Sequence, residues 1–196
     1  YWLENQPSVL SSHDNQWTQE VRVAGGSDRS TWLGGLYAYR VTNDGEFVVA
    51  GFPLADIDRN RLEGVAGFGE ATLALSDRWR VTLGGRLSAD RREGRGRTAF
   101  GATNESHHEF DHHDRKLGAE YDAAPATLLY ATVQTGYQPG TYNLFPATPQ
   151  QSNEVREAEM IAWSAGVKSR LLDGRLQLNN EVFYYDYRDL LVQSFN

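Results

Sequence analysis

Residues 107–114, HHEFDHHD, carry the side chains of this sequence that are best suited to chemistry, and they hold four of its five histidines. Imidazole and carboxylate groups at this density can bind Zn²⁺, Ni²⁺ or Cu²⁺, or capture a metal chelate. Successive side chains of a strand point to opposite faces, so His112 and His113 can face one ion only if the chain bends between them. The alternative is a solvated loop that runs into a strand and binds nothing. The candidate metal ligands are His107, His108, His112 and His113.

Two further groups of side chains are candidates for binding a solute. Residues 91–97, RREGRGR, form a basic and glycine-rich stretch whose Arg95 and Arg97 can bind an anionic substrate or lipopolysaccharide phosphates. Aromatic rings at and after residue 137 can stack on an aromatic or sugar ligand. These rings belong to Tyr137, Tyr142 and Phe145. The competing interpretations are a solvated loop for the arginines and loop packing for the rings.

Catalytic interpretations find little support in the sequence. The pair Gly94 and Gly96 lacks the strand–loop–helix context of a nucleotide site, and the adjacency of residues 11–14, SSHD, is no evidence for a triad, which is spatial. The chain has no cysteine, which excludes disulfides and thiol chemistry. With 26 acidic and 19 basic residues, its net charge of -7 argues against nucleic acid as a partner. We therefore predict neither an enzyme nor a cofactor.

The elements that must position these side chains are predicted to be strands, because hydrophobicity alternates with a period of two. In residues 79–90 the odd positions are apolar or small, and the even positions carry the polar groups. None of the 196 residues belongs to an apolar run long enough for a membrane-spanning helix. The predicted strands are about eight in number, at 17–24, 30–40, 64–75, 79–90, 116–121, 129–134, 161–168 and 176–184.

The connections between these strands indicate their surroundings. Short turns are predicted at 25–28, 76–78, 123–126 and 172–174, and they alternate with long polar connections at 41–62, 91–112 and 138–157. Short turns at one end and long loops at the other are typical of outer-membrane barrels. A soluble antiparallel sheet with one buried face, acting as a binding module, is the alternative. In a barrel the lumen-facing residues would include Arg80, Arg86, Glu120, Lys168 and Glu181.

Several stretches, in order along the chain, resemble the β-barrel of TonB-dependent outer-membrane receptors. Ser164 and Gln138 depart from the residues that are usual in that family. The matching stretches are TQEVRV at 18–23, WLGGLYAY at 32–39, FGEAT at 68–72, TLGGRL at 82–87, LLYA at 128–131, TGYQPG at 135–140, AGVKS at 165–169, LDGRL at 172–176 and FYYDY at 183–187.

This resemblance implies an all-β, antiparallel, up-and-down transmembrane barrel of 22 strands in the Gram-negative outer membrane. Residues 1–196 would form about eight of those strands, a partial barrel domain without the N-terminal plug. The implied partners are outer-membrane lipid, the TonB energy-coupling complex acting through the plug, and a small-molecule or metal-chelate substrate such as an iron–siderophore complex. A passive porin, or another outer-membrane barrel, is the alternative function. The chain begins without Met and ends within a strand pattern, so we expect a fragment.

Overall fold

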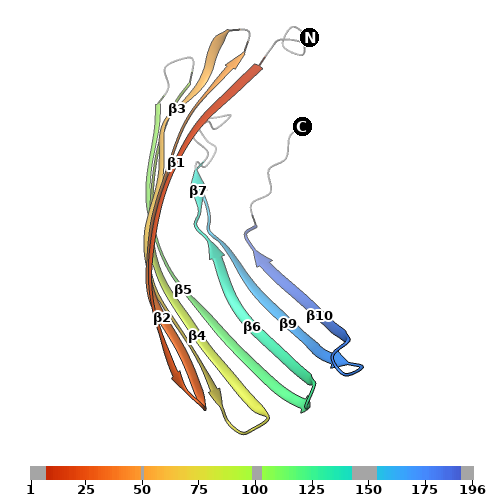
Figure 1. Cartoon of the computed structure of the whole chain (residues 1–196). Helices are drawn as coiled ribbons and strands as arrows, with labels where there is room; N and C mark the ends of the chain where they lie inside the picture. Colours follow the sequence, from red (N-terminus) through yellow and green to blue (C-terminus); the bar gives the residue numbers. More distant parts are fainter. Residues whose placement is uncertain (1–7, 50, 99–102, 143–153, 191–196) are drawn as a thin grey trace.

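A single antiparallel sheet forms the fold (Figure 1), as seen in a computed structural model that describes residues 8–49, 51–98, 103–142 and 154–190. Its eight strands follow the order β1-β2-β3-β4-β5-β6-β9-β10, so sequence neighbours are also sheet neighbours, and a small hairpin, β7–β8, lies between β6 and β9. The bounds are β1 Ser8–Ser27, β2 Ser30–Val49, β3 Phe52–Ala74, β4 Trp79–Thr98, β5 Thr103–Ala124, β6 Thr127–Gln138, β7 Thr141–Tyr142, β8 Glu154–Val155, β9 Ala158–Leu171 and β10 Leu176–Arg188. The predicted all-β, up-and-down architecture is confirmed.

The four predicted short turns all lie at one end of the sheet, the lower end in Figure 1. The last of them uses left-handed backbone at Leu172, Asp173 and Gly174, with φ of 55°, 54° and 84°. Within the described ranges, no helix is long and apolar enough to cross a membrane.

Two of the three long connections differ from the prediction, because most of their residues are strand. The β2–β3 ladder continues to the pair Val49 and Phe52, and the β4–β5 ladder continues to Arg97 and Thr103. Ladder hydrogen bonds join backbone groups and need no hydrophobic alternation, so polar residues can extend a strand. In the third connection, the described residues Thr141–Tyr142 and Glu154–Val155 pair with each other outside the main sheet, as the β7–β8 hairpin.

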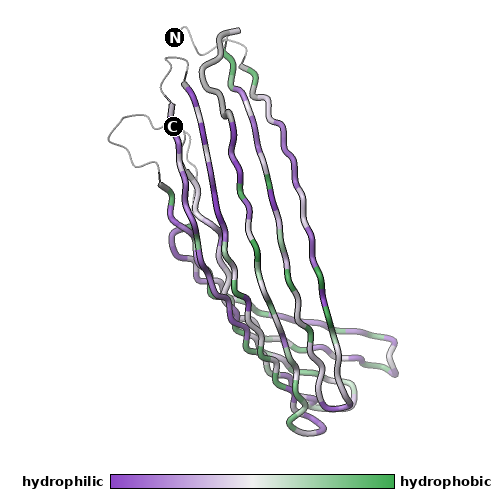
Figure 2. Tube along the Cα trace, turned by 90° about the vertical axis from the view of Figure 1, so that its left-hand side faces the viewer, coloured by the Kyte–Doolittle hydropathy of each residue, from purple (hydrophilic) through white to green (hydrophobic). Residues whose placement is uncertain are grey.

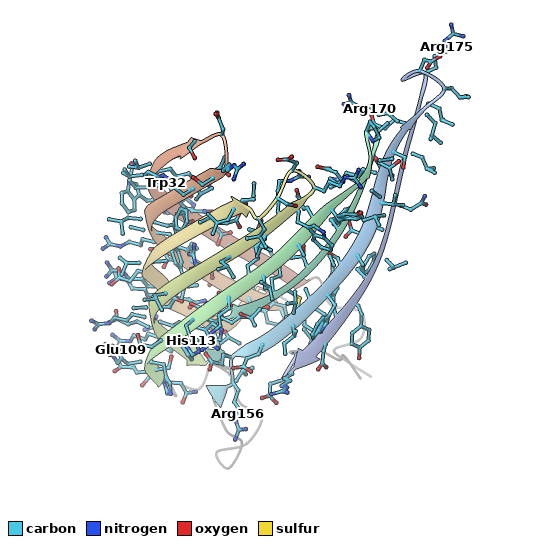
Figure 3. The ribbon with its side chains drawn as sticks, turned by 90° about the horizontal axis from the view of Figure 1, so that it is seen from below. Trp32, Glu109, His113, Arg156, Arg170 and Arg175 are labelled. Carbon is cyan, nitrogen blue, oxygen red and sulfur yellow. The ribbon has the colours of Figure 1, made fainter. Side chains whose placement is uncertain are left out.

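One face of the sheet is largely apolar, with Asp111, His113 and Arg115 of β5 as polar exceptions. Its side chains come from every strand of the main sheet and are well exposed; Leu87 is 70% and Val182 is 73% exposed. Among the described residues, no large side chain is fully buried. The green segments of Figure 2 lie along the strands rather than in a central core, and Figure 3, viewed from the short-turn end, shows side chains leaving both sides of one curved layer. An apolar face of this size requires a cover.

Candidate functional site

The opposite face of the sheet is polar, and the five residues predicted to face a lumen share it. Arg80 is paired with Glu120 across the β4–β5 ladder, and Gly166, two residues before Lys168, is paired with Glu181. Directly opposed residues point to the same side of a sheet, and so do residues two apart on one strand. Arg86 lies on the same side as Arg80, whereas Leu83 and Leu87 lie on the apolar face.

Side chains on this polar face meet across an intervening strand, over a glycine. Tyr39 Oη on β2 donates a 2.8 Å hydrogen bond to Asp90 Oδ1 on β4, directly above Gly64 of β3. A Cβ atom at Gly64 would overlap the Asp90 carboxylate. Such contacts require the side chains of alternate strands to converge, and curvature produces convergence only on the concave side. The polar face is therefore the concave face.

The same arrangement occurs twice more along the sheet. Lys116 Nζ on β5 lies 2.7 Å from Glu70 Oε2 on β3, above Gly84. The Tyr130 hydroxyl on β6 donates a hydrogen bond to Glu181 on β10, above Gly166. These long polar side chains therefore lie along the concave face and form hydrogen bonds and ion pairs with one another. The space in front of the concave face is thereby left open.

Near the short turns, the polar face holds a compact ion-pair group. Arg80 Nε donates to Glu120 Oε2 at 2.8 Å, while its two terminal nitrogens donate to both carboxylate oxygens of Asp122 at 2.6 and 3.0 Å. Bidentate pairing of a guanidinium with a carboxylate is the strongest and most directional form of such a contact. Arg86 lies 5.4 Å from the centre of the Tyr37 ring, and Lys168 lies 5.0 Å from that of Tyr130.

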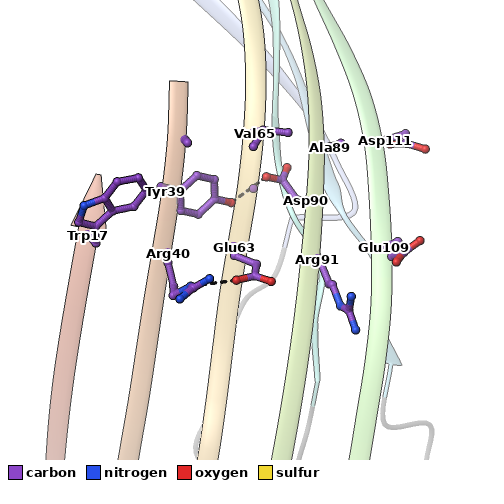
Figure 4. Close-up of a pocket in the computed structure, with 12 residues that line it drawn as sticks. Trp17, Tyr39, Arg40, Glu63, Val65, Ala89, Asp90, Arg91, Glu109 and Asp111 are labelled. Atoms are coloured by element: carbon purple, nitrogen blue, oxygen red, sulfur yellow. Dashed lines mark hydrogen bonds and ion pairs between the residues drawn. The ribbon is translucent and has the colours of Figure 1, made fainter. Parts of the chain in front are cut away.

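A row of charged side chains marks the far end of the apolar face. Arg40, Glu63, Arg91 and Glu109 are successive ladder partners on β2 to β5. Figure 4 shows the Arg40 Nε to Glu63 Oε2 contact, 2.9 Å long, with Trp17 in the same row. From Trp79 to Ala89, the apolar face of β4 carries no charge, and this matches the roughly 9–11 residues of a tilted strand that cross a bilayer.

Beyond this row, β4 and β5 carry polar side chains on both faces. Arg91 donates a 2.7 Å hydrogen bond to Glu93 Oε1, and this contact holds the pKa of the Glu93 carboxyl below its usual range. His107 Nδ1 lies 3.5 Å from the same Glu93 oxygen. On β4 the charged side chains of the apolar face thus lie beyond the apolar band, whereas on β5 Asp111 and Arg115 lie within it.

A seam opens in the wall where β5 and β6 separate. Their ladder ends, on this side, at the pair Lys116 and Gln134. Just past that pair, Thr135 Oγ1 accepts a hydrogen bond from the Arg115 N–H at 3.0 Å and donates one to Asp114 Oδ1 at 3.1 Å. At the start of the seam, the Thr135 hydroxyl therefore takes the place of the backbone hydrogen bonds that join β5 and β6 elsewhere.

His112 lies at this seam and is held on two sides. Its ring stacks on the Tyr137 ring with centroids 4.0 Å apart, and its Nε2 lies 3.4 Å from Asp114 Oδ1. The His112 side chain is only 11% exposed. Ligand atoms of His112, Glu157 and Glu159 all lie within 4.8 Å of one another, in an arrangement that can hold a metal ion.

The structure does not bring the four predicted metal ligands together. All four lie on β5, where His108 and His112 belong to the polar face and His107 and His113 to the other, although the rings of the adjacent His112 and His113 have centroids 5.9 Å apart. Glu157 and Glu159, which do meet His112, were absent from the predicted set. They are distant from His112 in sequence and lie beside it only because β9 pairs with β6. The run of histidines does not predict this pairing.

The predicted solute-binding residues are also dispersed. Arg95 and Arg97 alternate on β4 with the buried Gly94 and Gly96, so they lie on the same side as Arg91, away from the polar face. Arg95 Nε lies 3.5 Å from Glu105 Oε1. Tyr137 lies at the seam, Tyr142 belongs to β7, and Phe145 lies outside the described residues.

Arg92 connects β4 to the start of the β7–β8 hairpin. Its terminal nitrogen donates a 3.1 Å hydrogen bond to the Gly140 carbonyl, just before β7. Burial lowers the pKa of the Arg92 guanidinium. The hairpin is thus tied to the polar face of β4.

Comparison with known proteins gives a consistent result. The family described as TonB dependent receptor-like, beta-barrel, matches residues 2–196. The ferric yersiniabactin uptake receptor FyuA from Yersinia pestis is 22% identical over 95% of this chain and 30% of its own, with a TM-score of 0.80. The ferric-catecholate import receptor Fiu from Escherichia coli K12, in its closed form, is 16% identical over 91% and 32%, with a TM-score of 0.70.

A third solved structure, the siderophore receptor PiuA from Acinetobacter baumannii, is 12% identical over 90% of this chain and 32% of its own, with a TM-score of 0.66. The chain spans about a third of the length of these receptors. At these identities the solved structures establish the fold, and the family match covers nearly every residue. The chain therefore belongs to the TonB-dependent receptor-like β-barrel family, whose members are barrel proteins of the Gram-negative outer membrane.

Proposed function

We propose that this sheet forms part of the wall of an outer-membrane receptor that imports a scarce solute with energy from the TonB complex. The observation that carries the proposal is the division of one curved layer into an apolar convex face and a polar, internally paired concave face. A closed barrel leaves no backbone group unpaired in hydrocarbon, so such a layer fits a membrane only as part of a closed wall. The implied barrel has 22 strands and an N-terminal plug.

The proposed substrate is an iron–siderophore complex. Support comes from the similar structures, which are those of a ferric yersiniabactin uptake receptor, a ferric-catecholate import receptor and a siderophore receptor. The polar face, with Arg86, Lys116 and Lys168 among its charged groups, offers cations to an anionic chelate that passes along the wall. We propose no catalytic step.

The experiment is uptake of radioactive iron by cells that express the intact protein under iron limitation, with a panel of ferric siderophores. We expect uptake of at least one complex, and we expect it to stop when TonB is deleted or the proton gradient is collapsed. Uptake that continues unchanged without TonB would contradict energy coupling and would support the alternative, a passive porin. A strain that lacks the protein gives the baseline.

A further inference from the structure

We propose that His112, Glu157 and Glu159 form a binding site for a divalent transition-metal ion at the seam between β5 and β6. Their ligand atoms already lie within 4.8 Å of one another. Donors around a tetrahedral zinc ion, at bond lengths of about 2.0–2.1 Å, are roughly 3.4 Å apart. Glutamate side chains have three rotatable bonds, so a small change of rotamer closes this difference without moving the strands.

The imidazole at the centre of the site is held in place before any ion arrives. Tyr137 stacks on one side of it at 4.0 Å, and the Asp114 carboxylate lies 3.4 Å from its Nε2. Asp114 is itself oriented by the Thr135 hydroxyl at 3.1 Å. A carboxylate beside a metal-binding histidine fixes the orientation of the ring. His112 has these supports, whereas His107 and His113 point to the other face.

The charges around His112 also favour a cation. Glu157 and Glu159 converge there, and Asp114 adds a third carboxylate. In the part of the chain that the structure describes, neither Glu157 nor Glu159 has an ion-pair partner. Like charges brought together repel, and a bound divalent ion converts this repulsion into attraction.

The donor set indicates the class of ion. One imidazole nitrogen with two carboxylates suits Zn²⁺ and its first-row neighbours, because Ca²⁺ and Mg²⁺ take oxygen donors and copper(I) prefers sulfur. Three protein ligands leave a fourth position for water or for a donor atom of a solute. The ion would join β5 to the start of β9 across β6, and so close the seam beside the β7–β8 hairpin.

The test is a calorimetric titration with Zn²⁺ alone of the intact protein, purified from outer membranes in detergent. We expect one saturable site. His112→Asn and the double variant Glu157→Gln with Glu159→Gln should each weaken binding at least tenfold. Asp114→Asn, which leaves the three ligands in place, should weaken it by about 10–100-fold. The matched control is His107→Asn, on the same strand but the opposite face and beside Glu93, and its affinity should stay within twofold of the parent.

Two results would overturn the proposal: an intact protein that binds no Zn²⁺ at micromolar concentrations, or a control variant that loses as much affinity as His112→Asn. Heat-modifiable migration on a gel shows whether each variant forms a barrel. If His112→Asn does not, the glutamate pair decides the question, because both residues lie at or before the start of β9. Binding of the bare ion is measured without transport, so this test and the uptake test can fail separately.

Discussion

At the scale of single residues, the polar face depends on positions where a side chain must be absent. Gly64 is such a position, because the Tyr39 hydroxyl reaches the Asp90 carboxylate through the space that a Cβ would occupy. Asp90 is only 5% exposed, so its carboxylate has little room to move aside. The glycine therefore serves packing between alternate strands rather than a turn.

We predict that Gly64→Ala destabilises the barrel by about 1–3 kcal/mol, the usual cost of inserting an atom into a packed region. Gly67→Ala is the matched control on the same strand, because a Cβ there meets only the Leu36 side chain at an ordinary 3.7 Å. The measurement is the urea dependence of unfolding of the intact protein in lipid vesicles. Equal losses of stability for the two variants would show that the space above Gly64, through which Tyr39 reaches Asp90, is not what requires a glycine there.

At the scale of strands, hydrophobicity alternates with a period of two only where the two faces of the sheet differ in polarity. Residues 79–90 alternate clearly between an apolar and a polar face, and this alternation alone predicts a strand there. Residues 91–98 and 103–112 are also strand but carry polar groups on both sides, so hydrophobicity could not distinguish them from a loop.

The same limit explains what the sequence could predict of the candidate metal site. The histidine run marks β5 as a source of ligands, and the expectation that His112 and His113 diverge follows from strand geometry alone. Glu157 and Glu159 lie beside His112 for two reasons: β6 pairs with β9, and the β5–β6 ladder ends before it reaches His112. Neither feature is encoded in the local pattern around residue 112.

Neighbouring residues of β6 test the assignment of the two faces. Val133 lies on the apolar face between Leu117 and Trp163, while Gln134 is paired with Lys116 on the polar face. We predict that Val133→Arg destabilises the barrel by about 2–4 kcal/mol, the cost of a cation against the middle of a bilayer. Gln134→Arg should cost little. The fraction of protein that folds into vesicles at increasing urea measures both, and equal tolerance would contradict the assignment.

At the scale of the whole molecule, the buried hydrophobic residues of the described sheet are three alanines, Ala66, Ala158 and Ala162, which is too little for a hydrophobic core. Among the described strands, β1 and β10 each have a single neighbour in the sheet. An open edge presents unpaired backbone groups, which are costly in lipid and promote association in water. The proposed 22-stranded wall would supply partners for both edges, and lipid would supply the cover for the apolar face.

The central claim is that the convex face contacts lipid and the concave face contacts water, and a spin-label scan of β4 tests it most directly. These 196 residues have no cysteine, so single cysteines are placed at each position from 79 to 91 of the intact protein in vesicles, after any cysteine elsewhere in it is replaced by serine. We predict that Val81, Leu83 and Leu87 positions are accessible to oxygen dissolved in lipid, with even positions accessible to a water-soluble nickel reagent. This alternation between oxygen access and nickel access should end at Arg91. Equal access of the nickel reagent to both faces would contradict the account.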